Sequence, residues 1–170
     1  MTDTNLDQIL AKRQTARKEI VNVDEPLIKL VIFALGEDWF AFHGERIREI
    51  LTKASIFFVP GCPGSLEGVI NVRGDIESVI RLNELLQVPL PEPGTPSAIL
   101  LGSGTAMNSG IRIDRVVDLV DIPQSFIQPP PANLPDQMRP FVSGLLRFKE
   151  RPVSVLDLEQ IFSQYVKGLG

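Results

Sequence analysis

The sequence is poor in the residues that most often carry out chemistry, with one cysteine, one histidine, one tryptophan and one tyrosine among 170 residues. A single cysteine, Cys62, cannot form an internal disulfide, which is typical of a reducing compartment. With one histidine, the chain cannot assemble a His/Cys metal cluster. A nucleophilic triad or dyad would have to use His43, which ends an apparent strand before Gly44. We therefore expect no enzymatic activity, no cofactor and no metal site.

Long apolar runs are also missing, because no window approaches 18 uninterrupted apolar residues. The N-terminal MTDTNLDQ lacks the basic and then apolar pattern of a signal segment. The sequence therefore predicts a cytoplasmic protein without direct membrane insertion. Its formal net charge of −4 comes without a clustered basic excess. Since binding to phosphates needs such an excess, nucleic acid is not an expected partner.

Short runs rich in β-branched and aliphatic residues fill the chain from Leu27 onward, separated by many of its 14 prolines and 13 glycines. This pattern predicts a mainly β protein built as a small barrel or sandwich. Residues 1–25 differ, because they are polar and place a narrow apolar stripe at helical spacing. They predict an N-terminal amphipathic helix or tail, which either is solvated or docks on the domain or on a partner. The strands are expected at Leu27–Leu35, Trp39–His43, Val69–Arg73, Ile76–Leu82, Ala98–Leu101, Gly110–Ile113, Phe141–Phe148 and Val153–Leu156.

An internal repeat appears when the chain is aligned with itself. Gly68–Arg73 aligns with Gly144–Lys149, and Ser78–Leu86 aligns with Ser154–Phe162 at the same offset. Upstream, Arg46–Ile50 aligns with Arg115–Leu119 at a slightly different offset. We infer two copies of a β unit, at about 27–86 and 97–162, joined by a proline-rich linker.

Each copy has a size that buries only about 60% of its extended surface, so one copy alone would be marginally stable. The two units are therefore expected to share a core or to exchange terminal elements. Asn83–Leu86 and Glu159–Tyr165 are expected to form short helices that cover the seam between them. Residues 163–170 are expected to form a C-terminal tail.

The run from Leu66 to Ile76, LEGVINVRGDI, resembles the signature of the CheW-like domain family of chemotaxis coupling proteins. The flanking motifs FALG, IREI, VPGCP, GIRIDRV and VLDL follow in the family's order, so the resemblance covers about residues 27–162. It implies two SH3-like five-stranded β-barrel subdomains. It also implies a non-catalytic adaptor in chemotaxis or motility signalling, associated with receptor arrays at the membrane. The implied partners are the regulatory domain of a CheA-type histidine kinase and the helical hairpin tip of a chemoreceptor.

The resemblance also points to partner-binding residues. Arg73 and Glu49 match the family's signature arginine and glutamate, and we expect them to pair across neighbouring strands on a half-buried sheet. Either this pair holds the first barrel together or it contacts the receptor, and the sequence favours neither. Ile47 and Ile50 are candidates to line the receptor groove, although regular strand alternation allows only one of them to face it. Val72 and Gly74, which flank Arg73 in the signature, complete the candidate set.

Two features qualify this interpretation. Arg81 stands where the family usually has an aspartate, whereas the second copy retains Asp157, so a partner contact of the first-copy aspartate is in doubt. An alternative function is a CheW-like sensing module that binds a small molecule, such as a purine, between the barrels. Few polar anchors for such a pocket are visible in the sequence.

Overall fold

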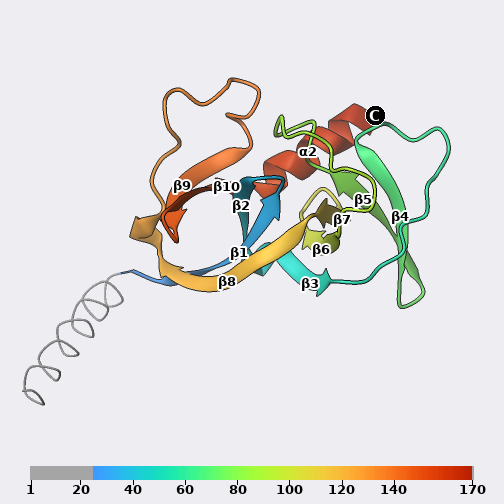
Figure 1. The fold of residues 1–170 in the computed structure, drawn as a ribbon, viewed down its shortest axis with the longest axis horizontal. Helices are drawn as coiled ribbons and strands as arrows, with labels where there is room; N and C mark the ends of the chain where they lie inside the picture. Colours follow the sequence, from blue (N-terminus) through green and yellow to red (C-terminus); the bar gives the residue numbers. More distant parts are fainter. Residues whose placement is uncertain (1–24, 170) are drawn as a thin grey trace, which may run out of the picture.

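The structure is a computed structural model that describes residues 25–169, so the predicted N-terminal helix or tail lies almost wholly outside the described residues. Over these residues the protein is mainly β, with one C-terminal helix and two short 3₁₀ turns (Figure 1). Its elements are β1 (Leu27–Leu35), β2 (Asp38–His43), η1 (Gly44–Arg46), β3 (Ile47–Leu51), β4 (Leu66–Val72), β5 (Asp75–Arg81), β6 (Ala98–Ser103), β7 (Asn108–Ile113), β8 (Arg115–Pro123), η2 (Gln124–Phe126), β9 (Val142–Phe148), β10 (Arg151–Leu156) and α2 (Leu158–Leu169).

The ten strands form two five-stranded sheets. Sheet A has the order β8-β1-β2-β10-β9, and sheet B has the order β3-β6-β7-β5-β4. Figure 1 shows the two curved sheets side by side, with α2 above the seam between them. The predicted mainly β class with two five-stranded units is confirmed.

The sequence repeat has a structural counterpart in the two sheets. The β4–β5 hairpin corresponds to the β9–β10 hairpin, and each is joined by a parallel strand pairing to β7 or β2, respectively. Matching isolated bridges, Phe57 with Val69 and Gln128 with Leu145, join the preceding loops to the first strand of each hairpin. The strand orders then show that β3, β6 and β7 of sheet B correspond to β8, β1 and β2 of sheet A.

Each sheet takes strands from both predicted copies, 27–86 and 97–162, so the copies exchange elements, which is one of the two arrangements expected from their small size. Sheet A joins β1 and β2 to β8, β9 and β10, and sheet B joins β3, β4 and β5 to β6 and β7. Each copy therefore contributes its first two strands to one sheet and its last three to the other. The two units are interleaved rather than consecutive along the chain.

The short connection from β2 to β3 explains this exchange. To stay in its own copy's sheet, β3 would have to occupy the place that β8 takes beside β1. The strand β8 begins opposite Ala34, whereas β2 ends opposite Leu30. The chain would need to run about 13 Å along β1 and cross two strand spacings of about 4.8 Å each. The three residues of η1 reach at most about 15 Å in a straight line and cannot also arch over β1.

Three apolar clusters hold the fold together. The largest is shared by both sheets and α2, and it includes Phe33, Phe42, Leu100 and Phe162. Two smaller clusters belong to single sheets, one centred on Leu30, Ile32 and Val155 and the other on Ile70, Val79, Ile99 and Leu101. A shared core is what the size of each copy predicted.

The helices differ from the prediction in two places. α2 continues to Leu169, so residues expected to form a C-terminal tail are mostly helical. Its residues Leu158, Ile161, Phe162 and Tyr165 are buried against the shared core, which stabilises the helix beyond its local propensity. The segment expected to be a helix at Asn83–Leu86 is a single turn instead, because Gln87 adopts a left-handed φ of 56° and Pro89 follows.

Candidate functional site

The β4–β5 turn presents the signature arginine at the surface of sheet B. Arg73 and Gly74 have φ angles of 52° and 92°, as the central residues of a type I′ hairpin turn require. The Gly74 N–H donates to Oδ1 of Asn71 at 2.8 Å, which fixes the turn. The Arg73 side chain is 73% exposed, and nothing lies within 4 Å of a Cβ placed at Gly74. The turn therefore projects into solvent.

Glu49 of β3 accepts a hydrogen bond from Arg73, with 2.6 Å between Oε1 and Nη2. The predicted pairing is confirmed, but its expected setting is wrong. The strands β3 and β4 lie at opposite ends of the strand order of sheet B, and the Arg73 side chain is exposed whereas that of Glu49 is half-buried. The hydrogen bond and the charge of Glu49 raise the pKa of the Arg73 guanidinium. The ion pair thus links β3, one edge strand of sheet B, to the turn that follows β4, the other edge strand.

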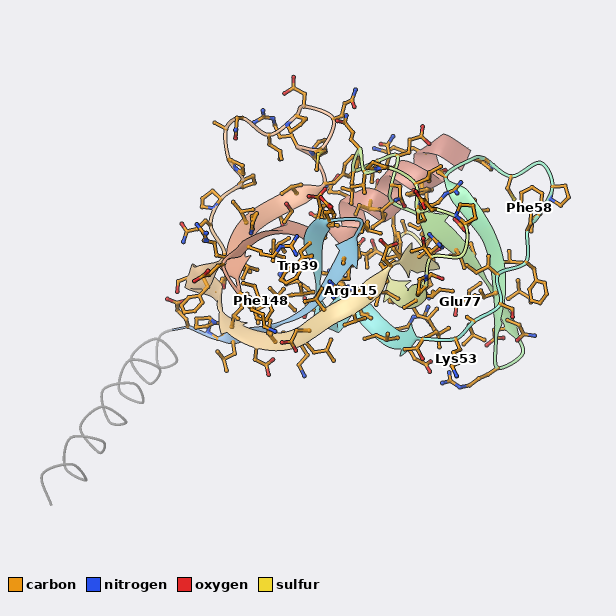
Figure 2. The ribbon with its side chains drawn as sticks, in the orientation of Figure 1. Trp39, Lys53, Phe58, Glu77, Arg115 and Phe148 are labelled. Carbon is orange, nitrogen blue, oxygen red and sulfur yellow. The ribbon has the colours of Figure 1, made fainter. Side chains whose placement is uncertain are left out.

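A second ion pair, which the sequence did not predict, runs beside the first. Arg48, adjacent to Glu49, lies 2.5 Å from Oε1 of Glu77 on β5 through its Nη2. Two neighbouring residues of β3 with opposite charges therefore reach the same hairpin, each to a residue of opposite charge. Figure 2 shows Glu77 between β3 and the β4–β5 hairpin in this view. The alternating charges of Arg48 and Glu49 were the available signal, but their partners depend on the curvature of the sheet.

A β-bulge decides where the two isoleucines point. The register of β3 against β6 shifts between Ile47 and Glu49, so Ile47 faces Gly102 and Ile50 faces Leu100. These two partners are separated by two residues and share a face of β6, which places both isoleucines on the same face. The expectation that only one could face a given side is therefore wrong. Both are half-buried and pack against the shared core.

The last candidate, Val72, is half-buried and packs on the interior cluster of sheet B. The structure thus brings Glu49, Arg73 and Gly74 together at an exposed edge. Ile47 and Ile50 lie on the opposite face of β3 from Glu49, toward the shared core, whereas Val72 packs in the separate cluster of sheet B. Figure 2 also shows Phe58, 75% exposed, on the outer loop between β3 and β4.

Sheet A carries no equivalent of the Glu49–Arg73 pair among the described residues. The corresponding positions are Asp118 on β8 and Lys149 in the β9–β10 turn. Oδ1 of Asp118 instead accepts from the backbone N–H of Leu119 at 2.8 Å, and the Lys149 ammonium lies over the Phe148 ring at 5.4 Å. A sheet of this shape therefore forms without that ion pair.

Arg81, which stands where the resemblance leads us to expect an aspartate, forms contacts within this chain. It lies beside Arg112 on the parallel neighbour β7, and Glu67 lies between them. The Nε atoms of Arg81 and Arg112 are 3.2 Å and 3.5 Å from the two carboxylate oxygens of Glu67, and Arg81 Nη2 donates to the Gly64 carbonyl at 2.5 Å. Glu67 thus offsets the repulsion between two adjacent like charges.

Over residues 25–169, no group of three or more histidine, cysteine, aspartate or glutamate side chains is arranged to hold a metal ion. Cys62 is a free, half-buried thiol, and His43 is half-buried at the end of β2. In the same part of the chain, no helix has the length and apolar character to cross a membrane.

Comparison with known proteins gives one consistent result. The family model described as the CheW-like domain matches residues 29–166. The Probable chemotaxis protein CheW of Rhizobium etli is 28% identical over 136 residues, which cover 80% of this chain and 88% of that protein. The Chemotaxis protein CheW of Treponema pallidum is 27% identical over 154 residues, covering 86% and 89%.

The structural comparison agrees with the sequence comparison. The crystal structure of the scaffolding protein TtCheW from Thermoanaerobacter tengcongensis matches with a TM-score of 0.70 and 26% identity, covering 78% of this chain and 90% of that one. The matched 78% of this chain is more than either sheet contains, so the match spans both sheets. The chain therefore belongs to the CheW-like domain family.

Proposed function

We propose that the chain is a non-catalytic adaptor that couples chemoreceptors to a CheA-type histidine kinase in chemotaxis or motility signalling. The family match over 29–166 and the likeness to a scaffolding protein support an adaptor in chemotaxis. The adaptor would act in the cytoplasm at receptor arrays. It would bind the kinase's regulatory domain and the helical hairpin tip of a receptor.

The Glu49–Arg73 ion pair is the observation on which the proposed contact surface rests. An exposed ion pair of this kind contributes little to folding stability. The equivalent positions in sheet A lack it, so a five-stranded sheet of the same strand order forms without such a pair. Both observations favour a role in partner contact over a role in holding the barrel together. We therefore place the receptor-binding surface along β3 and the β4–β5 turn, with Ile47, Glu49, Ile50, Val72, Arg73 and Gly74 as its residues.

The proposed surface combines a charged pair with half-buried apolar side chains. A receptor helix that crosses the edge strand β3 would lay an apolar stripe against the exposed parts of Ile47 and Ile50 on one face, in the manner of helix-in-groove recognition, and would reach Glu49 past the strand edge. Its polar rim would then exchange hydrogen bonds with Glu49 and Arg73. Because these two groups already point at each other, little side-chain entropy is lost when a partner binds.

The test is a reconstituted assembly of receptor fragment, kinase and this chain. Glu49→Ala, Arg73→Ala and the double variant should each reduce receptor binding and receptor-dependent kinase activity, with unchanged melting temperatures. The matched control is Lys149→Ala, which removes a cation from the equivalent turn of sheet A. If the Glu49 and Arg73 variants melt earlier and bind normally once folded, the pair is structural and the proposed surface is wrong.

A cavity supports a second candidate function, which is small-molecule sensing. It has a volume of about 600 Å³ and lies between the loop at Pro63–Ser65, the turn at Glu84–Leu85, the loop at 136–141 and α2. Glu84, Gln137 and Gln164 give it hydrogen-bonding groups, and Phe141 provides an aromatic wall. Such a site suits a planar polar molecule, for example a purine base. Calorimetry with nucleobases and nucleotides tests this function, and saturable heat at micromolar concentration would favour it over the adaptor.

A further inference from the structure

Each half of the chain completes the sheets of the other half. Residues 25–88 supply β1 to β5, and residues 98–169 supply β6 to β10 and α2. Four strand pairings join the halves: β1 with β8, β2 with β10, β3 with β6, and β5 with β7. Neither half contains a complete sheet, so each half presents unpaired strand edges that only the other half can cover.

A single segment, residues 89–97, connects these halves, and it has no regular secondary structure. It contains Pro89, Pro91, Pro93 and Pro96, and most of its residues are exposed. Proline-rich segments of this kind favour an extended polyproline II conformation. The segment nevertheless reverses direction, although its proline content favours an extended chain.

The bend is one β-turn at Glu92–Thr95. The Thr95 N–H donates to the Glu92 carbonyl at 3.1 Å, and the Thr95 hydroxyl donates to the same oxygen at 2.6 Å. Pro93 and Gly94 occupy the central positions, and Gly94 has a φ of 86°. This is the arrangement of a type II turn, whose third residue must be glycine or asparagine. One glycine therefore permits the reversal that brings the halves of a single chain together.

We propose that this chain forms a dimer with a second copy of itself by exchanging halves, with residues 89–97 as the hinge and the Glu92–Thr95 turn opened. In that dimer, residues 25–88 of one copy pair with residues 98–169 of the other. Every strand pairing and the shared core are retained, and only the hinge conformation changes. The inference does not rest on the proposed adaptor function.

The balance between monomer and dimer is set by the hinge. In the monomer, the linker holds the two halves at a mutual concentration of about millimolar. The exchanged dimer therefore competes when the chain refolds near that concentration. Extension of the four-proline segment favours the dimer, and the two hydrogen bonds of the turn favour the monomer. The dimer would display two copies of the surface containing Glu49 and Arg73, because β3, β4 and β5 all lie in one half.

The first experiment changes the turn without touching the core. Gly94→Val forces a β-branched residue into a left-handed conformation, which disfavours the closed turn by about tenfold per hinge. Two hinges open in each dimer, so its dissociation constant should fall about hundredfold, to roughly ten micromolar. No atom lies within 4 Å of a Cβ at Gly94, so local strain is the only direct effect. Mass is measured by light scattering after refolding from denaturant at stated concentrations.

The matched control is Gly61→Val. Gly61 has a φ of 84° and an equally open surrounding, but it lies in the loop between β3 and β4 and not in the hinge. It should lose stability to a similar extent and remain monomeric at the concentrations where Gly94→Val dimerises. If both variants have the same mass at all concentrations, hinge strain does not control association and the proposal is wrong.

The second experiment distinguishes exchanged halves from a simple face-to-face dimer in the full chain. Lys29 and Asp121 are exposed register partners on β1 and β8, one in each half. In a Cys62→Ser background, Lys29→Cys with Asp121→Cys should form a disulfide within one chain in the monomer and between chains in the exchanged dimer. Protein refolded at about millimolar concentration should therefore give covalent dimers on denaturing gels. Dimers that show only intrachain disulfides, or the absence of any dimer, would overturn the proposal.

Discussion

The only tyrosine of the chain, Tyr165, gives a sharp test of how α2 is held on sheet B. The residue is 8% exposed, and its hydroxyl donates to the Arg81 carbonyl at 2.6 Å. Burial, together with the nearby charge of Glu84, raises the pKa of Tyr165 to about 12, against an opposing effect of Arg81. Because the unfolded chain has a tyrosine pKa of about 10, the folded protein holds this proton more tightly.

The sign and size of the effect follow from that difference. Below about pH 10 the phenol is neutral in both states, so the stabilisation from the raised pKa is fully present. As the pH rises from about 10 to 12, the unfolded chain ionises first and the free energy of unfolding falls. The total loss approaches about 2.7 kcal/mol, at 1.36 kcal/mol for each unit of difference. Tyr165→Phe should remove this loss and should cost about 1 kcal/mol at neutral pH, for the hydrogen bond.

Wild type should therefore be more stable than Tyr165→Phe at pH 8 and less stable at pH 12. The free energies of unfolding of the two proteins should be equal at about pH 10.7. Urea unfolding across this range measures both proteins, and subtraction removes the titration of lysines and arginines. Because the chain has one tyrosine, its ultraviolet absorbance reports the ionisation of Tyr165 alone. A phenol that titrates near pH 10 in the folded protein, or a stability difference that does not change with pH, would refute the reasoning.

Three further predictions concern single side chains. Gly144→Ala should lower the free energy of unfolding by about 1–3 kcal/mol in urea titrations, because a Cβ there would overlap the side chain of Ile127. Phe162→Ala should cost about 3–5 kcal/mol, since its ring is fully buried in the shared core; a smaller loss with unchanged α2 helicity would contradict that core. Hydrogen bonds from the Thr105 hydroxyl and N–H lower the pKa of Glu159 in the folded protein. They therefore stabilise the fold at pH values above the pKa that Glu159 has in the unfolded chain. This stabilisation is lost as the pH falls through the lower pKa of Glu159 in the folded protein. Thermal melts should accordingly show the advantage of wild type over Glu159→Gln shrinking in acid, and a constant difference would exclude this link.

Local pattern was enough to locate most of the strands. Runs such as Leu27–Leu35 and Ala98–Leu101 are β-branched and aliphatic, and both are buried strands in the structure. The sequence indicates the strands β3 and β8 only as aligned segments of the repeat, because their mixed charged and apolar residues carry a weaker strand signal. The spacing of apolar residues around Asn83–Leu86 predicts a short helix, whereas the structure has a single turn there. The left-handed Gln87 that ends it has no signal in the residue itself.

The candidate site was predicted in composition but not in geometry. The signature run identified Glu49 and Arg73, and they do form an ion pair. The curvature of sheet B decides which strands this pair joins and how exposed its two side chains are. It also decides that Arg48 pairs with Glu77. The bulge that turns Ile47 and Ile50 to one face is likewise a property of the pairing between β3 and β6. Register and curvature arise between strands, so one strand's sequence cannot specify them.

The sequence by itself determined the strand content, the duplication and the family, because these follow from side-chain periodicity and ordered motifs that lie close together along the chain. Only the tertiary structure decided which strands share a sheet. The connection between β2 and β3 is too short to return across β1, so each copy must complete its sheet with strands from the other. That constraint acts on distances in space between segments far apart in sequence. Because of this constraint, strand pairings join the two halves of the chain in both sheets.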